Sequence, residues 1–203
     1  MFTGIVREVG QVRDRREAGD TTFRIGCARA PETIEIGASI CCNGVCLTAT
    51  ATGQDDTGPW FEVDASAETL SKTTLGAWQS GTKVNLEPSL RLGDEMGGHI
   101  VSGHVDGLGE IVGIEPEGAS HRVRIRTSKS LGRFIAQKGS IALDGISLTV
   151  NEVDDQGEMT TFGVNIIPHT WTVTSLADAS VGSEVNLEID LLARYVQRLA
   201  EAG

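Results

Sequence analysis

The sequence predicts an all-β protein built from two tandem six-stranded barrels, which are related by internal duplication and followed by a C-terminal α-helix. Three observations carry this prediction. Segments of the first half recur in the second half, short runs rich in β-branched residues alternate with glycine-rich turns, and the chain ends in residues with helical spacing.

The duplication is visible in several matched segments. SICCNGVCLT at residues 39–48 returns as SIALDGISLT at 140–149, and FEVDASAETLSKTTL at 61–75 returns as FGVNIIPHTWTVTSL at 162–176. VNLE at 84–87 recurs at 185–188, and FTGIV at 2–6 matches VSGHV at 101–105. A period of about 100 residues is too long for a solenoid repeat and indicates a duplicated domain, so we expect two similar folds with two similar pockets.

Each half carries the pattern of about six short strands. Runs rich in Val, Ile, Thr and Phe, separated by Gly, Asp and Asn, lie at residues 22–27, 39–42, 45–50, 60–64 and 84–87. The 25 glycines fit the tight turns and bulges of small barrels, in which closure removes exposed strand edges. One short helix is predicted in each half, at residues 68–75 and 170–176. The polar, glycine-rich stretch RLGDEMGG at 91–98 predicts the boundary between the halves.

The spacing of apolar residues changes to a helical one after the second barrel. A stripe along one side of the predicted helix contains Leu191, Leu192, Tyr195, Val196 and Leu199. The helix is expected to begin at Asp190 or its neighbour, and the first half has no counterpart. Such an amphipathic helix can pack on its own barrel or self-associate, and the sequence leaves both alternatives open.

Composition excludes several classes of function. The chain has 203 residues, 28 acidic against 17 basic residues, a net charge of -11 and only 4% aromatic residues. Binding to nucleic acid through phosphate neutralisation and base stacking is therefore not expected. No run of roughly 18 apolar residues is present, and no basic and then apolar leader follows Met1, so we expect a cytoplasmic protein without membrane contact.

The cysteine pattern does not predict a metal site or disulfides. Cys41 and Cys42 are adjacent, so on a strand they point to opposite faces, and their counterparts in the repeat are Ala142 and Leu143. These positions are therefore expected to need small or apolar side chains. Disulfides are not expected in a reducing compartment.

Two strands place small polar side chains on one face. Cys46 and Thr48 are two residues apart, as are Ser147 and Thr149 in the repeat, so each pair shares a face. Such side chains on a barrel wall are often merely hydrogen-bonded to backbone, but their recurrence in both halves favours a functional role.

Two histidines lie close together in GGHIVSGHVDG. His99 and His104 are five residues apart and would face opposite sides of a strand, which argues against joint metal ligation. Either imidazole could act as an acid or base near neutral pH, and either could be a loop histidine that only makes hydrogen bonds. The glycines at 107, 109 and 113 do not form a dinucleotide fingerprint, because a strand pattern follows them.

Several motifs together resemble one enzyme family. MFTGIV, NGVCLT, GDEMGGHIVSGHVDG, DGISLTV, NIIPHT and VNLEIDLLARY, which span residues 1–195, are similar to riboflavin synthases of the alpha-chain type. The resemblance implies Greek-key barrels that each bind one 6,7-dimethyl-8-ribityllumazine, at residues 1–93 and 98–188, and a helix at 189–203 that joins three chains into a homotrimer. It also implies active sites between the N-terminal barrel of one chain and the C-terminal barrel of its neighbour.

The implied reaction is a dismutation in which one lumazine gives a four-carbon unit to another, yielding riboflavin and 5-amino-6-(D-ribitylamino)uracil in the final step of riboflavin biosynthesis. This transferase reaction needs neither a metal nor a redox cofactor. Because the 7-methyl group of the substrate is unusually acidic, the protein would chiefly supply proximity, orientation and proton transfer. A functional association with lumazine synthase is a further possibility.

The resemblance also implies the residues of two pockets. The pocket of the N-terminal barrel is expected to comprise Gly4, Ile5, Val6, Cys46, Leu47, Thr48, Asp64, Ala65, Ser66, Ala67, Glu68 and Thr69. The pocket of the C-terminal barrel is expected to comprise Gly103, His104, Val105, Lys138, Ser147, Leu148, Thr149, Asn165, Ile166, Ile167, Pro168, His169 and Thr170. Backbone groups would bind the pteridine edge, while side chains near Thr48, Asp64 and Glu68, with their counterparts, would meet the ribityl hydroxyls.

Catalysis is expected from a small set of side chains. His104, Ser147 and Thr149 would lie near the reacting atoms, Cys46 and Ser39 would polarise the substrate from the other barrel, and His99, Phe2 and Asp190 would support them. The alternatives are a non-catalytic lumazine- or flavin-binding protein and the flavin barrel of a reductase. Recurrence of the polar pairs in both halves favours the enzyme, and two barrels leave no room for the nucleotide-binding domain of a reductase.

Overall fold

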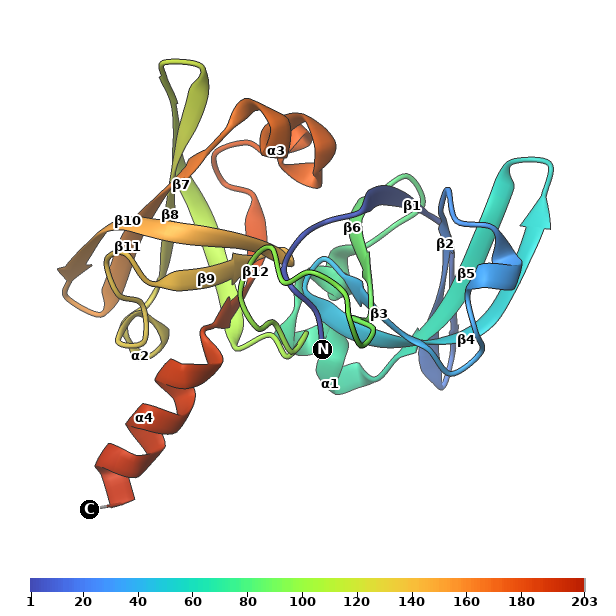
Figure 1. Cartoon of the computed structure of the whole chain (residues 1–203), viewed down its shortest axis with the longest axis horizontal. Coiled ribbons are helices and arrows are strands. Elements are labelled where there is room, and N and C mark those ends of the chain that lie inside the picture. The colour runs from blue at the N-terminus through green and yellow to red at the C-terminus, as the bar shows by residue number, and fades with distance from the viewer. Residues whose placement is uncertain (203) are drawn as a thin grey trace.

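The structure is a computed structural model that describes residues 1–202, and it contains two closed barrels with a helix extending from them (Figure 1). The first barrel consists of β1 (Glu8–Ala18), β2 (Asp20–Gly26), β3 (Ser39–Cys42), β4 (Val45–Asp55), β5 (Gly58–Ala65) and β6 (Lys83–Pro88). The second consists of β7 (Gly107–Glu117), β8 (Ser120–Ser128), β9 (Ser140–Leu143), β10 (Ile146–Gln156), β11 (Met159–Ile166) and β12 (Glu184–Ile189).

The two barrels have the same topology. Around the first barrel the strands follow the order β1-β2-β5-β4-β3-β6, and the corresponding strands of the second barrel follow the same cyclic order. All of the pairings are antiparallel. The predicted fold, two tandem six-stranded barrels from one duplication, is therefore confirmed.

The short helices differ from the prediction in two respects, because each half has one additional turn and each predicted helix is divided. They are α1 (Ala67–Lys72) with η2 (Thr74–Ala77), α3 (Pro168–Val173) with η3 (Ser175–Asp178), and two isolated turns, η1 (Pro31–Thr33) and α2 (Lys129–Gly132). The single helices expected at 68–75 and 170–176 are each divided by a threonine in extended conformation. The hydroxyl of Thr73 donates to Thr69 O at 2.7 Å and accepts from Leu75 N at 3.3 Å, so it closes one turn and begins the next. Thr174 repeats this arrangement.

Apolar side chains fill both barrels. Phe23 and Phe61 in the first barrel and Phe162 in the second are at most 1% exposed. Along β4, Val45, Leu47 and Ala49 are buried in this core, while Cys46 and Thr48 alternate to the outer face. The interior of each barrel is therefore occupied by side chains, and the predicted pockets can only lie on the outer walls.

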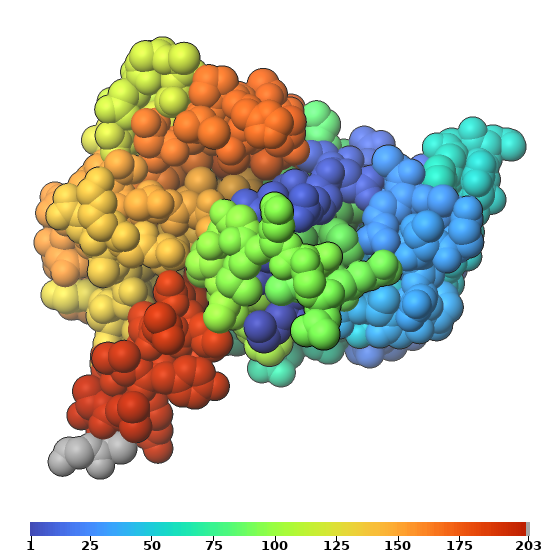
Figure 2. Space-filling model, viewed as in Figure 1, coloured from blue at the N-terminus to red at the C-terminus, as the bar shows by residue number. Residues whose placement is uncertain are grey.

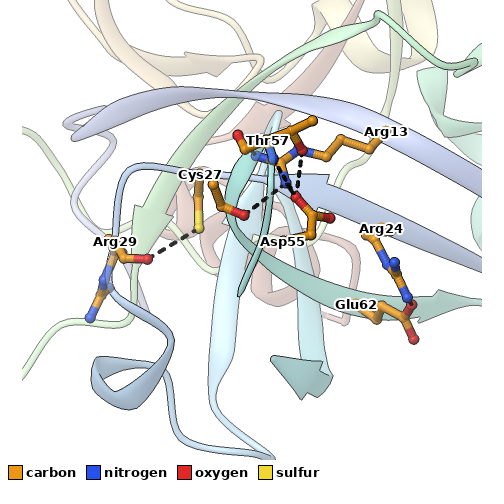
Figure 3. Close-up of polar contacts among 8 residues, drawn as sticks. Arg13, Arg24, Cys27, Arg29, Asp55, Thr57 and Glu62 are labelled. Atoms are coloured by element: carbon orange, nitrogen blue, oxygen red, sulfur yellow. Dashed lines mark hydrogen bonds and ion pairs between the residues drawn. The ribbon is translucent and has the colours of Figure 1, made fainter. Parts of the chain in front are cut away.

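Charged side chains lie on neighbouring strands of the first barrel, and Figure 3 shows Arg13 of β1, Arg24 of β2, Asp55 of β4 and Glu62 of β5. Arg13 pairs with Asp55 at 3.1 Å and donates to the carbonyl oxygens of Thr57 and Gly58, which ties a bulge in β1 to the turn between β4 and β5. These alternating charges, rather than apolar residues, explain why the sequence pattern did not single out residues 8–18 as a strand.

The C-terminal helix α4 (Leu191–Ala202) extends away from both barrels (Figure 1). Asp190 Oδ1 accepts from Leu192 N at 3.0 Å, which confirms the predicted start. Ion pairs of 2.8 Å from Arg194 to Asp106 and of 2.9 Å from Arg133 to Glu201 connect the helix with its own barrel. Gly203, the last residue of the predicted helical range, lies outside the described residues. Within residues 1–202, none of the helices has the length and apolar character needed to cross a membrane.

Candidate active site

Two equivalent segments meet at the junction of the barrels. Phe2 and Val101 form an isolated antiparallel bridge, with N–O distances of 2.7 and 3.1 Å. Phe2 is fully buried in a small cluster with Cys41, Val101 and Ala142, so it supports the segment from within. In Figure 2 the N-terminal segment and the stretch that joins the barrels lie against each other between the two halves.

Each of these segments crosses to the strand of the other half. Gly4 O accepts from Ser147 N at 2.8 Å, and Gly103 O accepts from Cys46 N at 2.8 Å. Both glycines have positive φ, +74° and +79°, and an added Cβ would lie 2.6 Å from the Cβ of Ser147 or Cys46. Glycine is therefore required at both positions.

This exchange corrects the expected grouping of the pocket residues. The segment Gly4, Ile5 and Val6 was assigned to the first barrel, and Gly103, His104 and Val105 to the second. The structure places them the other way round, because Val6 packs on the core of the second barrel and Val105 on the core of the first. Sequence similarity groups each segment with the half that contains it. In the structure, each segment packs on the barrel of the other half.

The polar pairs on β4 and β10 face outward, as predicted from their spacing. Cys46 and Ser147 are half-buried, and Thr48 and Thr149 are exposed. Ser39 pairs with Thr48 across β3 and β4. Leu47 is only 5% exposed and points into the barrel core, so only its backbone can face a ligand.

The two histidines lie in different surroundings. His99 Nδ1 is 2.7 Å from Ser147 Oγ, and burial lowers the pKa of His99, against the opposing influence of Asp190 and Glu188. His104 is exposed, and it follows the glycine that contacts Cys46. Within one chain, Ser147 therefore lies with His99 rather than with His104. No group of three or more possible metal ligands exists within the described range.

Most of the remaining predicted contacts form an exposed rim beside each pair, whereas Ala65 and Ile166, each 1% exposed, belong to the barrel cores. In the first half this rim is the end of β5 and the start of α1, where Thr22 Oγ1 donates to Asp64 Oδ1 at 2.6 Å and Ser66 Oγ accepts from Thr69 N at 3.2 Å. In the second half it is the end of β11 and the start of α3, with exposed residues Asn165, Ile167, Pro168 and His169. Lys138 is exposed and has a positive φ of 66°.

Two buried carboxylates at this site were not predicted from the sequence. Glu87 and Glu188 are 4% and 3% exposed, and they accept hydrogen bonds from the segments around Gly4 and Gly103. The signal was present in the repeated VNLE, because a glutamate that recurs directly after a core leucine requires a hydrogen-bond partner when it is buried.

The cysteines other than Cys46 fit the structural interpretation of the sequence. Cys41 and Cys42 are buried at 2% and 0% exposure, and burial raises the pKa of both thiols. All four cysteines are free thiols. Cys46 alone combines partial exposure with a place beside the exchanged glycine.

Comparison with known proteins decides the family. The model of the lumazine binding domain matches the chain twice, at residues 3–89 and 102–190. A riboflavin synthase of Brucella abortus is 51% identical over 99% of this chain and 98% of its own length. The chain belongs to the riboflavin synthase family. A riboflavin synthase of Mycobacterium bovis is 44% identical over all of both chains, and one of Bacillus subtilis is 38% identical over 98% of this chain and 89% of its own.

Solved structures agree with the fold. LumP in complex with riboflavin has a TM-score of 0.81 and 25% sequence identity, covering 93% of this chain and 99% of LumP. LumP has also been solved with 6,7-dimethyl-8-(1'-D-ribityl) lumazine, and that structure has a TM-score of 0.79 at 25% identity over the same shares of the two chains.

Proposed function

We propose that this chain is a riboflavin synthase, a transferase that converts two molecules of 6,7-dimethyl-8-ribityllumazine into riboflavin and 5-amino-6-(D-ribitylamino)uracil. The observation that carries the proposal is the repeated contact of a glycine segment with an outward polar strand, Gly4 with Ser147 and Gly103 with Cys46. A reaction between two copies of one molecule needs two such pockets. Family membership at 51% identity to a riboflavin synthase supports the same reaction.

The chemistry suits so modest a set of side chains. One lumazine loses the four-carbon unit that the other gains, so electrons balance between two identical substrates without an external redox cofactor or metal. The substrate supplies an acidic 7-methyl group, and the protein holds the two heterocycles together and moves protons. The exposed apolar side chains of α4 fit a homotrimer, in which a neighbouring chain would complete each active site.

Proton transfer is assigned to the histidine-bearing segments. The lowered pKa of His99 keeps its imidazole neutral near pH 7, so it can exchange a proton with the Ser147 hydroxyl 2.7 Å away. His104 is exposed on the segment that contacts Cys46 and would reach the second heterocycle. Thr149, two residues after Ser147 on β10, and Ser39, which pairs with Thr48 across β3 and β4, would orient the substrates.

The assay is direct. Purified protein incubated with the lumazine alone should develop the yellow-green fluorescence of riboflavin, with and without EDTA. A His104→Gln variant should lose at least about 10²-fold in kcat if His104 transfers the proton, because general acid–base catalysis contributes about 10²- to 10⁴-fold. Undiminished turnover in this variant eliminates the role of His104, and absence of riboflavin in the wild-type reaction contradicts the proposed function.

A non-catalytic lumazine-binding protein is the second candidate, since the similar LumP structures contain riboflavin or the lumazine. Such a protein needs only one pocket, whereas here Cys46 with Thr48 and Ser147 with Thr149 are present in both halves. Binding without turnover in the same assay would favour this candidate. We further propose a cytoplasmic location and an association with lumazine synthase. Pull-down of the two purified proteins would test the association.

A further inference from the structure

Two buried carboxylates occupy equivalent positions in the barrels. Glu87 ends the VNLE of β6 and Glu188 ends the VNLE of β12, and their exposed fractions are 4% and 3%. Neither forms an ion pair with a basic side chain of residues 1–202. A charge removed from water in this way must be compensated by hydrogen-bond donors.

The donors all come from the glycine segments. Glu87 accepts from Thr3 N and Thr3 Oγ1, both at 2.7 Å, and from Gly4 N at 2.9 Å. Glu188 accepts at 2.6 Å from both the backbone N–H and the hydroxyl of Ser102. It also accepts from Gly103 N at 2.8 Å and His104 N at 3.1 Å. Charge-assisted bonds of this kind are short and directional, so each carboxylate fixes the path of its segment.

Each glycine segment also bonds to the barrel that does not contain its glutamate. Glu87 belongs to the first barrel, but Gly4 bonds to Ser147 of the second barrel. Glu188 belongs to the second barrel, but Gly103 bonds to Cys46 of the first barrel, and His104 follows directly. The glycines leave no space for adjustment, since even a Cβ would approach within 2.6 Å of the facing side chain.

We propose that Glu87 and Glu188 are positioning residues that act crosswise: Glu87 shapes the pocket of the second barrel, and Glu188 shapes the pocket of the first. This inference rests on the proposed function, because it concerns the same two pockets. It also explains why a glutamate recurs at the end of both VNLE segments, because the leucine before it points into the barrel core while the glutamate points away from the core toward the glycine segment.

The first test uses isosteric substitutions. Glu87→Gln and Glu188→Gln each replace an acceptor oxygen with an amide donor that faces N–H groups, while Glu110→Gln on the outer face of β7 is the matched control. Each of the first two should lower kcat/KM by up to about 10²-fold, the effect of a displacement near 1 Å, and the control should retain wild-type kcat/KM. Wild-type kcat/KM in both variants would overturn the proposal.

A double-mutant cycle distinguishes positioning from a general loss of stability. Glu87→Gln should be non-additive with Ser147→Ala and additive with Cys46→Ala, and Glu188→Gln should show the reverse pattern. Coupling of each glutamate to the cysteine or serine of its own barrel, or equally to both, would overturn the crosswise assignment. Should the glutamine variants fail to fold, Thr3→Val and Ser102→Ala remove one donor each and keep the charge, and the same pattern is expected of them.

Hydrogen exchange of the ligand-free protein separates this inference from the proposed function. Glu87→Gln should speed amide exchange around Gly4 and Ser147 and leave the region around Gly103 unchanged, and Glu188→Gln should do the opposite. This pattern in a chain that makes no riboflavin would refute the function and keep the positioning. Unchanged exchange in an active enzyme would refute the positioning alone.

Discussion

At the scale of single residues, the junction between the barrels depends on a polar network with one chemical difference between its halves. Asn43 Oδ1 accepts from Asn85 N at 2.6 Å, and Asp144 Oδ1 accepts from Asn186 N at 2.8 Å. Each asparagine amide then donates to a backbone carbonyl of the opposite half, Asn85 to Asp144 and Asn186 to Asn43. The amide of Asn43 in the first half thus corresponds to the carboxyl group of Asp144 in the second half.

Asp144 should make stability depend on pH. Burial raises its pKa to about 7, while the bond from Asn186 N opposes this rise. Because the unfolded pKa is about 4, its contribution to stability is complete below pH 4 and is lost as the pH rises through 7. The loss is at most about 4 kcal/mol, at about 1.4 kcal/mol for each unit of pKa.

Asp144→Asn should therefore flatten the dependence of the unfolding free energy on pH between 5 and 8. Urea unfolding at several pH values measures this dependence. Asn43→Asp is the matched control, since it adds a second buried acid and should steepen the loss of stability with rising pH. An Asp144→Asn protein that loses as much stability as the wild type over this range contradicts the raised pKa.

At this scale, the face on which a side chain lies was predictable from the sequence, whereas its hydrogen-bond partner was not. The spacing of Cys46 with Thr48 and of Ser147 with Thr149 sufficed to place each pair on one outer face. The bonds of Glu87 to Thr3 span 84 residues, so no local pattern could predict them. The hydrogen bond between His99 and Ser147 was unpredictable for the same reason, because the two residues are 48 positions apart in the sequence.

At the scale of elements, the equivalent helices α1 and α3 are stabilised by different interactions. Ser66 Oγ caps α1 by accepting from Thr69 N, whereas α3 begins at a proline and has no side-chain cap. Instead, Trp171 of α3 stacks on His121 of β8, with ring centroids 3.9 Å apart and planes inclined by 14°. We expect this stack to hold α3 in place of the missing side-chain cap.

His121→Ala should loosen α3 and reduce stability by about 1 kcal/mol, the typical contribution of an aromatic pair. With Trp60 and Trp78 replaced by phenylalanine, the remaining fluorescence reports Trp171 and should shift to longer wavelength in the alanine variant. His121→Phe keeps a ring and should retain the wild-type spectrum. An alanine variant with unchanged spectrum and stability would show that the stack does not orient α3.

The elements were predictable where local pattern governs them. Most strands have β-branched runs between turns, and the structure places strands at each predicted run. The helices at 68–75 and 170–176 were predicted as continuous because their apolar spacing continues, but the threonine hydroxyls at 73 and 174 compete for backbone groups and divide them.

At the scale of the whole molecule, α4 carries a stripe of exposed apolar side chains. Leu192, Tyr195, Val196 and Leu199 are between 62% and 74% exposed, and burying each such side chain contributes roughly 1.5 to 3 kcal/mol. The stripe that the sequence predicted is thus present, but it does not pack on its own barrel. Of the two alternatives, we propose self-association, because these side chains are exposed in the single chain.

Truncation before Asp190 should therefore convert the proposed trimer into monomers, as measured by light scattering or analytical ultracentrifugation. Replacing Leu192 and Leu199 with serine should have the same effect without shortening the chain, while Arg198→Ala on the same helix serves as the control. A shortened chain that remains trimeric removes α4 as the trimer seam.

The repeat made the two barrels predictable, but not the contacts that join them. Two copies of one sequence imply two barrels, and they suggest that each copy is self-contained. The exchange of the segments at Gly4 and Gly103 follows from contacts across the junction, which similarity between the halves cannot reveal. The proposed pockets therefore combine residues of both copies.

The most direct test is a crystal structure of the protein with a non-reactive lumazine analogue. We predict one analogue beside Gly4 and Ser147 on the second barrel and another beside Gly103 and Cys46 on the first. Occupation of a single barrel, with protein side chains filling the equivalent place on the other, would contradict the account.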